Sequence, residues 1–197
     1  MIEIVFATNN PNKLLEVQSQ MPDGIELISL ENIGCIEEIP ETQKTIQANA
    51  IQKADYIKSK YLLDCFADDT GLEVEVLNGA PGVHSARYAG PEKNADNNIR
   101  KLIDALKNED NRKAQFRTVV ALHFKGELLI FEGVCKGVIT KVAHGSDGFG
   151  YDPIFKPTGY QKTFGELSLE EKNSISHRGL AISKVMAFFK QKNNLIK

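Results

Sequence analysis

A long hairpin pattern in the second half of the chain restricts the fold more than any other feature. Residues 115–124 and 128–140 read as two long strands, and Lys125-Gly126 lies between them as turn residues. Elsewhere, strand-like and helix-like segments alternate along the chain, which is typical of parallel β-α-β units. A chain that combines such units with one antiparallel hairpin is expected to fold as an α/β protein with a mixed β-sheet.

The remaining segments supply the other strands and helices. Hydrophobic periodicity predicts strands over residues 2–7, 26–30, 65–67 and 72–76. It predicts helices that begin at Pro11 and over residues 45–61, 94–106 and 176–190. No internal repeat or break in composition divides the 197 residues, so one domain over 1–197 is expected.

Composition excludes several classes of protein. The formal net charge of −2 gives no basic field for nucleic acid, so an anionic substrate needs a local cluster of cations. No apolar run approaches the ~20 residues that span a bilayer, and the first residues lack the basic start of a signal peptide. A cytoplasmic protein without membrane partners is therefore expected. Cys35, Cys65 and Cys135 show no metal-finger or CxxC spacing, which favours buried thiols over a zinc or redox site.

Three polar segments are candidates for chemistry, and the first is the turn that follows the first strand. Its residues are Thr8, Asn9, Asn10, Pro11, Asn12 and Lys13. A turn that opens a helix directs backbone N–H groups and the positive end of the helix dipole toward an anion. Lys13, in the first helical turn, could reach a phosphate. The spacing is not that of a Walker loop, and a plain helix-capping turn is the alternative.

The second candidate is the acidic pair Asp68-Asp69, followed by Thr70 and Gly71. Because successive side chains of a strand point to opposite faces, only one of the two carboxylates is expected to enter a substrate site. Carboxylates with open positions suit Mg²⁺, which binds through few protein ligands plus substrate phosphates. Glu38 and Glu41 are further candidate ligands. A solvated acidic turn is the alternative.

The third candidate combines a glycine- and aromatic-rich stretch with cations farther along the chain. Gly148 and Gly150 flank Phe149 and would let a flat ring, such as a nucleobase, approach the backbone. Positive charge and hydrogen-bond donors follow at Lys172, His177 and Arg178. A structural aromatic turn and an exposed helix cap are the alternatives for the two parts.

Five motifs in this order resemble the inosine triphosphate pyrophosphatase family, also called the dITP/XTP pyrophosphatases, over nearly the whole chain. They are ATNN with Lys13, ADDTGL at 67–72, GAPGVHSARYAG at 79–90, GFGYDPIF at 148–155, and EKN with SHR at 171–178. The resemblance implies hydrolysis of noncanonical purine nucleoside triphosphates such as ITP, dITP and XTP to the monophosphate and pyrophosphate. It also implies an elongated, two-lobed fold with a central substrate cleft, Mg²⁺ as cofactor, and a homodimer.

The resemblance assigns a role to each matching residue. Asp69 is expected to be the catalytic carboxylate, and Asp69 and Glu41 to bind Mg²⁺, with Asp68 supporting Asp69. The residues expected to bind substrate are Thr8, Asn9, Asn10, Pro11, Asn12, Lys13, Lys53, Thr70, Phe149, Gly150, Tyr151, Asp152, Lys172, His177 and Arg178. Within this set, residues 8–13, Lys53 and Lys172 would hold the triphosphate. Phe149 would stack on the base, and Asp152, His177 and Arg178 would read its edges.

The chain departs from the family pattern in three places. Gln43-Lys44 replaces the usual glycine turn after Glu41, Gly165 stands where alanine is common, and Ala48 lacks a frequent carboxylate, so no metal role is assigned to Ala48. Two other functions remain open: a pyrophosphatase for modified pyrimidine nucleotides, and a nucleotide sensor without catalysis.

Overall fold

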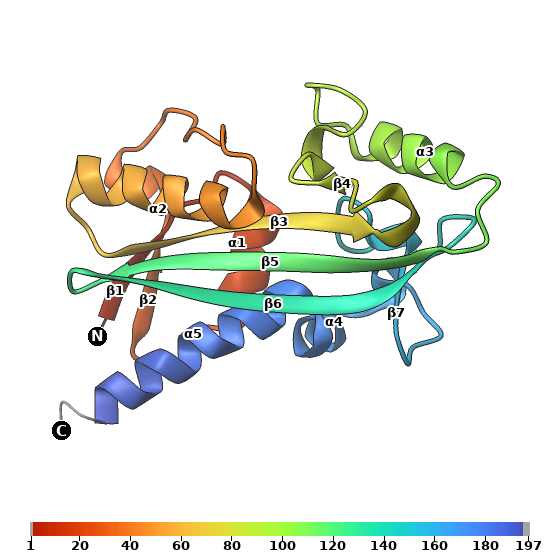
Figure 1. Ribbon diagram of the computed structural model, residues 1–197. Helices are drawn as coiled ribbons and strands as arrows, with labels where there is room; N and C mark the ends of the chain where they lie inside the picture. Colours follow the sequence, from red (N-terminus) through yellow and green to blue (C-terminus); the bar gives the residue numbers. More distant parts are fainter. Residues whose placement is uncertain (1, 195–197) are drawn as a thin grey trace. The chain divides into compact units, whose positions relative to one another are not determined.

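The chain alternates strands and helices in its first half and then forms the long hairpin. The computed structural model describes residues 2–194 (Figure 1). The strands are β1 Ile2–Phe6, β2 Ile25–Ile28, β3 Cys65–Val74, β4 Pro81–Gly82, β5 Lys113–Phe124, β6 Glu127–Ile139 and β7 Phe155–Pro157. The α-helices are α1 Pro11–Gln18, α2 Ile46–Tyr61, α3 Ala95–Ala105, α4 Leu169–Ile175 and α5 His177–Asn194. Short 3-10 helices cover Glu31–Ile33, Glu75–Leu77, Ser85–Arg87, Asp152–Ile154 and Phe164–Glu166.

The strands form one sheet in the order β2-β1-β3-β5-β6-β7, with β4 paired to β3. β1 pairs in parallel with both β2 and β3, whereas β4 and β7 pair antiparallel with β3 and β6. The predicted α/β class and mixed sheet are therefore confirmed. Lys125 and Gly126 connect β5 to β6 with φ of 48° and 85°, the positive values that a tight hairpin turn requires at both positions.

The chain divides into two compact units. Unit 1 comprises Met1–Asp69, Thr118–Gly133 and Arg178–Lys197, and unit 2 comprises Thr70–Arg117 and Val134–His177. No helix among residues 2–194 has the length and apolar character needed to cross a membrane.

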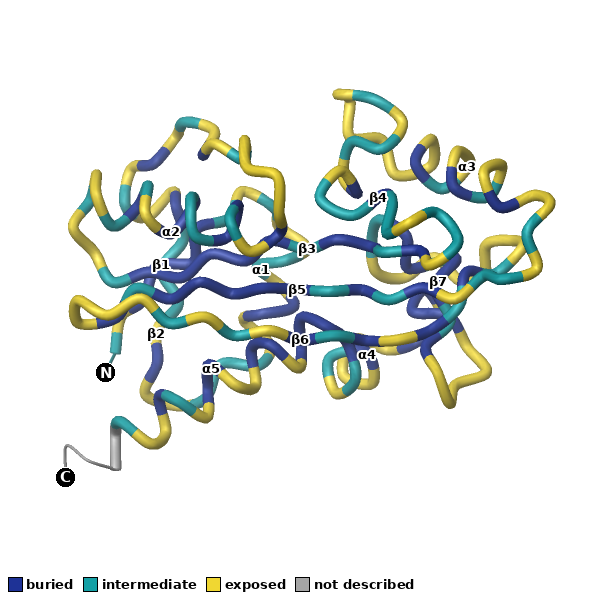
Figure 2. The backbone as a smooth tube through the Cα atoms, viewed as in Figure 1, coloured by how far each residue is buried: buried dark blue, intermediate teal, exposed yellow. Residues whose placement is uncertain are grey.

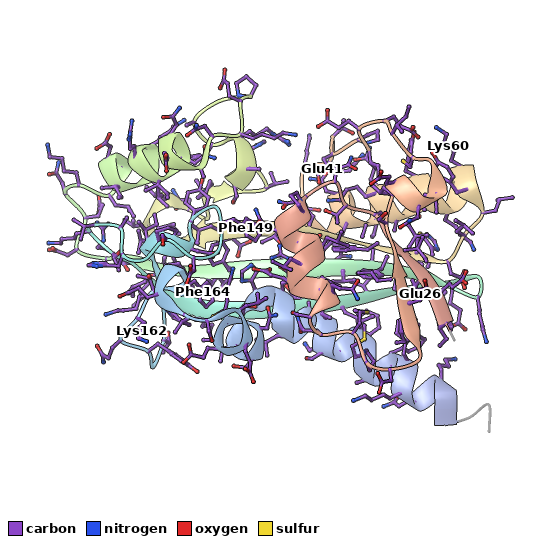
Figure 3. The ribbon with its side chains drawn as sticks, turned by 180° about the vertical axis from the view of Figure 1, so that it is seen from behind. Glu26, Glu41, Lys60, Phe149, Lys162 and Phe164 are labelled. Carbon is purple, nitrogen blue, oxygen red and sulfur yellow. The ribbon has the colours of Figure 1, made fainter. Side chains whose placement is uncertain are left out.

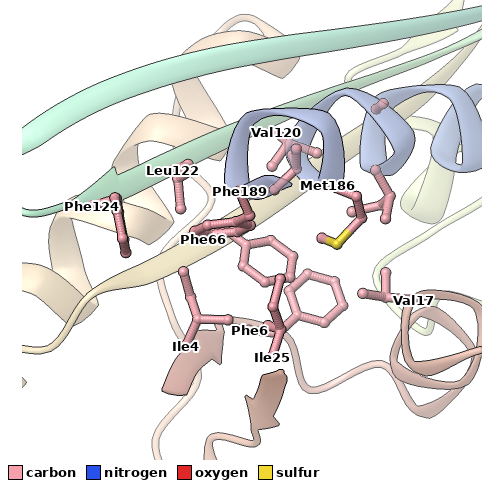
Figure 4. Packing of buried hydrophobic residues seen from close by; sticks show 13 residues of the cluster. Ile4, Phe6, Val17, Ile25, Phe66, Val120, Leu122, Phe124, Met186 and Phe189 are labelled. Atoms are coloured by element: carbon pink, nitrogen blue, oxygen red, sulfur yellow. The ribbon is translucent and has the colours of Figure 1, made fainter. Parts of the chain in front are cut away.

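In unit 1, the side chains of successive strand residues point to opposite faces of the sheet, and both faces carry apolar side chains. Most residues of β1 and β3 are buried (Figure 2). On one face, Phe6 and Phe66 stack with ring centroids 4.6 Å apart and pack against Val17 of α1 and Phe189 of α5 (Figure 4). On the other face, the strands pack against α2 through a second cluster that includes Val5, Cys65, Ala67, Ala50, Ala54 and Ile57. The helices α1 and α5 therefore cover one face of this part of the sheet, and α2 covers the other.

Unit 2 has a core of its own. Leu72 and Val74 of β3, Leu102 of α3 and the rings of Phe155 and Phe164 are buried in one cluster. Arg112 supports this core through the backbone, because its guanidinium donates to the carbonyls of Leu106, Ile139 and Thr140 at 2.7 to 2.9 Å. The three cysteines are all free and buried, as the sequence predicts.

The prediction for β3 is wrong, and one helix of the C-terminal region was not predicted. The strands predicted at 65–67 and 72–76 are one continuous strand that passes through Asp68, Asp69, Thr70 and Gly71. The acidic pair does not end the strand because both carboxylates have polar partners inside the fold. The sequence prediction also missed α4, although Ser168 and Glu171 form a capping box at its start.

Two leucines of the hairpin test the core of unit 1. Leu122 is fully buried, whereas Leu128 is 41% exposed. We expect Leu122→Ala to lower the free energy of unfolding by about 2–5 kcal/mol, because it leaves a cavity in a packed core. Leu128→Ala should change it by less than about 1 kcal/mol, since little buried contact is lost. Urea denaturation followed by circular dichroism measures both, and equal losses would contradict this packing.

Candidate active site

The turn between β1 and α1 is built as a helix cap. Asn10 is the N-cap residue, and its side-chain oxygen accepts hydrogen bonds from the backbone N–H groups of Asn12 and Lys13 at 3.0 and 3.3 Å. Thr8 Oγ1 accepts from Asn10 N at 3.2 Å, and Pro11 occupies the first helical position. The turn is therefore a helix cap, and phosphate binding at it stays a prediction. The cap also fixes the direction in which Lys13 leaves the helix.

Lys13 reaches the buried carboxylate of Asp68. Its Nζ lies 2.9 Å from Asp68 Oδ1, and the Asp68 side chain has no exposed surface. Arg178, at the start of α5, donates from Nε to Asp68 Oδ2 at 3.1 Å. The Asp68 carboxylate is thus held by two cations, and each cation comes from a different helix.

Arg178 is also paired on its other side. Its Nη1 lies 2.5 Å from Glu16 Oε2, and both side chains are almost fully buried. Glu16 follows Lys13 by three residues on α1, so the two side chains project from the same face of the helix. The result is a buried chain of alternating charges, Glu16–Arg178–Asp68–Lys13.

Lys53 of α2 connects the acidic pair to Glu41. Its Nζ donates to the backbone carbonyl of Asp68 at 2.6 Å and forms an ion pair with Glu41 Oε1. Glu41, labelled in Figure 3, precedes α2 in the loop that follows the first 3-10 helix. Burial works against both charges, but their mutual attraction lowers the pKa of Glu41 and raises that of Lys53. Both groups are therefore charged at neutral pH.

Asp69 lies on the opposite face of β3 from Asp68, as strand alternation predicts. Its neighbour two residues earlier, Ala67, packs in the cluster under α2, and Asp69 Oδ2 accepts a hydrogen bond from Asn49 of α2 at 3.1 Å. The side chains of Asp68 and Asp69 thus face different helices, although they are adjacent in sequence.

The two carboxylates also differ in basicity. Burial disfavours the charge of Asp68, but Lys13, Arg178 and Lys53 outweigh it and hold the pKa of Asp68 well below its usual range. For Asp69 burial wins, and the pKa of its carboxyl is raised despite the attraction of Lys53 and Lys13. Asp68 is therefore a fixed anion, whereas Asp69 is the stronger proton acceptor.

The donor set around Asp69 fits a magnesium ion held by few protein ligands. Among residues 2–194, no three His, Cys, Asp or Glu side chains are grouped as a preformed metal site. Mg²⁺ needs no such group, because it usually binds through one or two carboxylates together with phosphate oxygens and water. Glu41 and Asp69 supply two carboxylates, and the charge of Glu41 is close enough to help raise the pKa of Asp69.

In unit 2, the loop around Phe149 is organised by Asp152. Asp152 Oδ2 accepts from the backbone N–H of Phe149 at 2.7 Å and from Lys172 Nζ at 2.6 Å. Gly148 has a φ of +75°, and a Cβ there would clash with Asp152 Oδ2, so only glycine fits this close approach. Phe149, labelled in Figure 3, is half-buried with Lys172 Nζ 5.0 Å from its ring centroid.

Two more predicted residues are buried in unit 2. The His177 ring stacks on Phe116 with centroids 4.4 Å apart and is 3% exposed. The Tyr151 hydroxyl donates to the backbone carbonyl of Ser85 at 2.9 Å. The segment 79–90, which the family motif includes, therefore helps to hold the aromatic loop through its backbone.

The predicted residues form two groups, one in each unit. Unit 1 holds residues 8–13, Glu41, Lys53, Asp69 and Arg178, whereas unit 2 holds Thr70, residues 149–152, Lys172 and His177. Lys172, expected to bind triphosphate, pairs with Asp152 beside Phe149. The guanidinium of Arg178 donates to two carboxylates. Its reading of a base therefore stays a prediction.

Sequence reasoning missed Glu16 and Asn49. The helical spacing of Glu16 from Lys13 places both side chains on one face of α1, but the partner of Glu16, Arg178, lies 162 residues away in the chain. Asn49 carried no local signal, because its partners, Asp69 and the backbone of Gln43, are brought to it by the tertiary fold.

Comparison with known proteins gives consistent matches over nearly the full length. The model of the Ham1 family matches residues 4–188. The chain is 57% identical over 185 residues to a dITP/XTP pyrophosphatase of Flavobacterium johnsoniae, covering 94% of this chain and 96% of the relative. It is 51% identical to a dITP/XTP pyrophosphatase of Porphyromonas gingivalis, covering 95% and 97%.

Solved structures agree with the sequence comparison. The Ham1 protein of Staphylococcus aureus superposes with a TM-score of 0.88 at 39% identity, covering 96% of this chain and 99% of that one. A HAM1 protein of Coxiella burnetii superposes with a TM-score of 0.89 at 39% identity, covering 97% and 100%.

A double-mutant cycle tests the buried charge chain. We expect Arg178→Met to lower the free energy of unfolding by about 3–5 kcal/mol, because Glu16 and Asp68 then lose a shared partner inside the fold. In the background of Glu16→Gln, the same substitution should cost less, since one carboxylate no longer needs a partner. Urea denaturation of the two single variants and the double variant measures the coupling. Strictly additive losses would mean that Glu16 and Arg178 do not interact.

Proposed function

Because the chain belongs to the Ham1 family, we propose that it hydrolyses noncanonical purine nucleoside triphosphates, namely ITP, dITP and XTP, to the monophosphate and pyrophosphate. The observation that carries this proposal is the arrangement of the acidic pair: Lys13 and Arg178 hold the Asp68 carboxylate, which leaves Asp69, on the other face of β3, as the carboxylate that can act as a base. Phosphoanhydride hydrolysis needs such a base together with charge neutralisation and an aligned water.

Asp69 is the proposed catalytic carboxylate. It orients the attacking water and accepts its proton, the role of a general base within reach of that water. Asp68 keeps Lys13 and Arg178 in place. The opposite orientations of the two side chains on β3 thus divide the two tasks between them.

Phosphate binding is assigned to residues 8–13, Lys53 and Lys172, as the resemblance to the family implies. Lys13, Lys53 and the turn of residues 8–13 supply cations and the start of a helix. Three cations in unit 1, Lys13, Lys53 and Arg178, face four carboxylates, Glu16, Glu41, Asp68 and Asp69, so the group is formally −1 when all are ionised. One Mg²⁺ on Glu41 and Asp69 would make it +1 and would neutralise charge on the phosphate oxygens. This change of sign supports Mg²⁺ as the cofactor.

Base recognition is assigned to Phe149, Asp152, His177 and Arg178, as the resemblance to the family implies. Phe149 offers a half-buried ring for stacking, and Thr70 is assigned a contact to the substrate. Asp152 accepts from the backbone N–H of Phe149, and Asp152 and His177 are assigned to the edges of the base. Hypoxanthine and xanthine carry an acceptor at O6, where adenine carries an amino donor. Donors placed against O6 are left without partners when adenine binds, which disfavours ATP by orders of magnitude.

The proposal includes several broader properties. The whole chain acts as a single catalytic domain in the cytoplasm without nucleic acid, which its length, composition and net charge support. It forms a homodimer, a property that rests on the resemblance to the family. Hydrolysis of modified pyrimidine nucleotides and nucleotide sensing without catalysis are the competing functions, and each predicts a different outcome with a panel of nucleotides.

The substrate panel is the first test of this function. We expect rapid release of pyrophosphate from ITP, dITP and XTP, and release from ATP slower by at least about 10²-fold, because a base that leaves buried donors unpaired is strongly rejected. GTP and dUTP complete the panel, and removal of divalent metal with EDTA should abolish turnover. Equal rates with ATP and ITP would exclude the proposed recognition. A preference for dUTP would favour the pyrimidine enzyme, and binding without release would favour the sensor.

The role of Asp69 can be tested separately from binding. We expect Asp69→Asn to lower kcat by about 10²–10⁴-fold, the usual contribution of a general base. Nucleotide binding should persist, since Lys13 and Lys53 are unchanged. Asp55→Asn is a matched control, because Asp55 lies on the exposed surface of α2 and pairs with His123. Near-normal kcat for Asp69→Asn at saturating Mg²⁺ would show that another group activates the water.

A further inference from the structure

Asn49 contacts both Asp69 of β3 and the loop that carries Glu41. Its side chain is 1% exposed in the first turns of α2. Nδ2 donates to Asp69 Oδ2 at 3.1 Å, and Oδ1 accepts from the backbone N–H of Gln43 at 2.8 Å. One amide group therefore holds the carboxylate of Asp69 and a backbone position two residues after Glu41.

A second contact fixes the same loop from a different residue of α2. Gln52, one helical turn after Asn49, accepts from Thr42 N through Oε1 and donates from Nε2 to Thr42 Oγ1, both at 2.9 Å. The loop is thus attached to α2 at two consecutive residues, Thr42 and Gln43. The two attachments differ in burial, and the hydrogen bond to Asp69 comes from Asn49.

We propose that Asn49 is a positioning residue that aligns Asp69 and Glu41 as a pair of metal-binding carboxylates. An amide that donates to Asp69 Oδ2 fixes the orientation of that carboxylate and therefore the direction in which Oδ1 points. Its other end holds the backbone beside Glu41, so a displacement of either carboxylate strains the same side chain. This inference rests on the proposed function, because it assigns the alignment a role in binding Mg²⁺.

The partners of groups that bind a metal are usually as important for its geometry as the ligands themselves. Loss of such a partner typically costs about 10–100-fold in metal affinity or activity. Asn49 satisfies this description on both sides of the proposed site, whereas Gln52 satisfies it on one side and from a more exposed position. A comparison of variants of Asn49 and Gln52 therefore separates two effects: attachment of the loop to α2, and orientation of the Asp69 carboxylate.

The experiment compares Asn49→Ala with Gln52→Ala. Binding of Mn²⁺ to the nucleotide-free protein is followed by electron paramagnetic resonance, and the kcat and KM for ITP are measured in parallel. We expect Asn49→Ala to weaken Mn²⁺ binding and to lower kcat, each by about 10–100-fold, with a smaller change in KM. Gln52→Ala should stay within about threefold of the wild type, since Asn49 still holds the loop. Equal losses in the two variants would reduce Asn49 to a loop anchor and overturn the proposal.

Asn49→Asp decides the outcome if the alanine variant does not fold, which circular dichroism detects. This variant keeps an oxygen for Gln43 N–H but loses the amide donor to Asp69. The added carboxylate by its charge alone would strengthen Mn²⁺ binding, so weaker Mn²⁺ binding together with a lower kcat supports orientation of Asp69. Mn²⁺ binding as tight as in the wild type or tighter overturns it. A wild type inactive on every nucleotide would refute the proposed function alone, because the Mn²⁺ titration tests the alignment without substrate.

Discussion

The buried carboxylate of Asp68 is the contact on which unit 1 depends. An aspartate without exposed surface in the middle of a strand would strongly destabilise the fold if it had no partner. Lys13 from α1 and Arg178 from α5 approach its two oxygens, and Lys53 from α2 binds its backbone carbonyl. Three helices are thereby tied to one residue of β3. A buried ion pair rarely adds net stability over a well-packed apolar group, but it specifies which elements must meet.

The same strand explains how two neighbouring carboxylates acquire different properties. Strand geometry alone separates Asp68 from Asp69 and turns them toward different helices. The oxygens of Asp68 then meet two cations, whereas Asp69 Oδ2 meets the neutral amide of Asn49. Burial raises the pKa of Asp69 more than the nearby lysines lower it, whereas the cations around Asp68 outweigh its burial. A site that needs both a permanent anion and a base can therefore use consecutive residues.

Local patterns predicted the parts of the fold that depend on local physics. The turn Lys125-Gly126, the cap at Asn10 and the opposite orientation of Asp68 and Asp69 all follow from backbone preferences within a few residues. The continuity of β3 through Asp69 could not be predicted in this way. Adjacent carboxylates read as a turn until Lys13 and Arg178, 55 and 110 residues away in the chain, are known to reach Asp68. The pairing of Glu16 with Arg178 is equally non-local.

The loop after Glu41 departs from the family motif without strain in its backbone. Gln43 and Lys44 stand where glycines are usual, and a glycine is needed only where the backbone takes a positive φ or another group comes very close. Among residues 2–194, the non-glycine residues with positive φ are Leu62, Asn78, Lys93 and Lys125, so neither Gln43 nor Lys44 is strained. Gln52 and Asn49 hold Thr42 and Gln43 through hydrogen bonds that use their backbone N–H groups, which every residue except proline possesses. The position of Glu41 is therefore set by α2, and the identity of the side chains that follow it is free to vary.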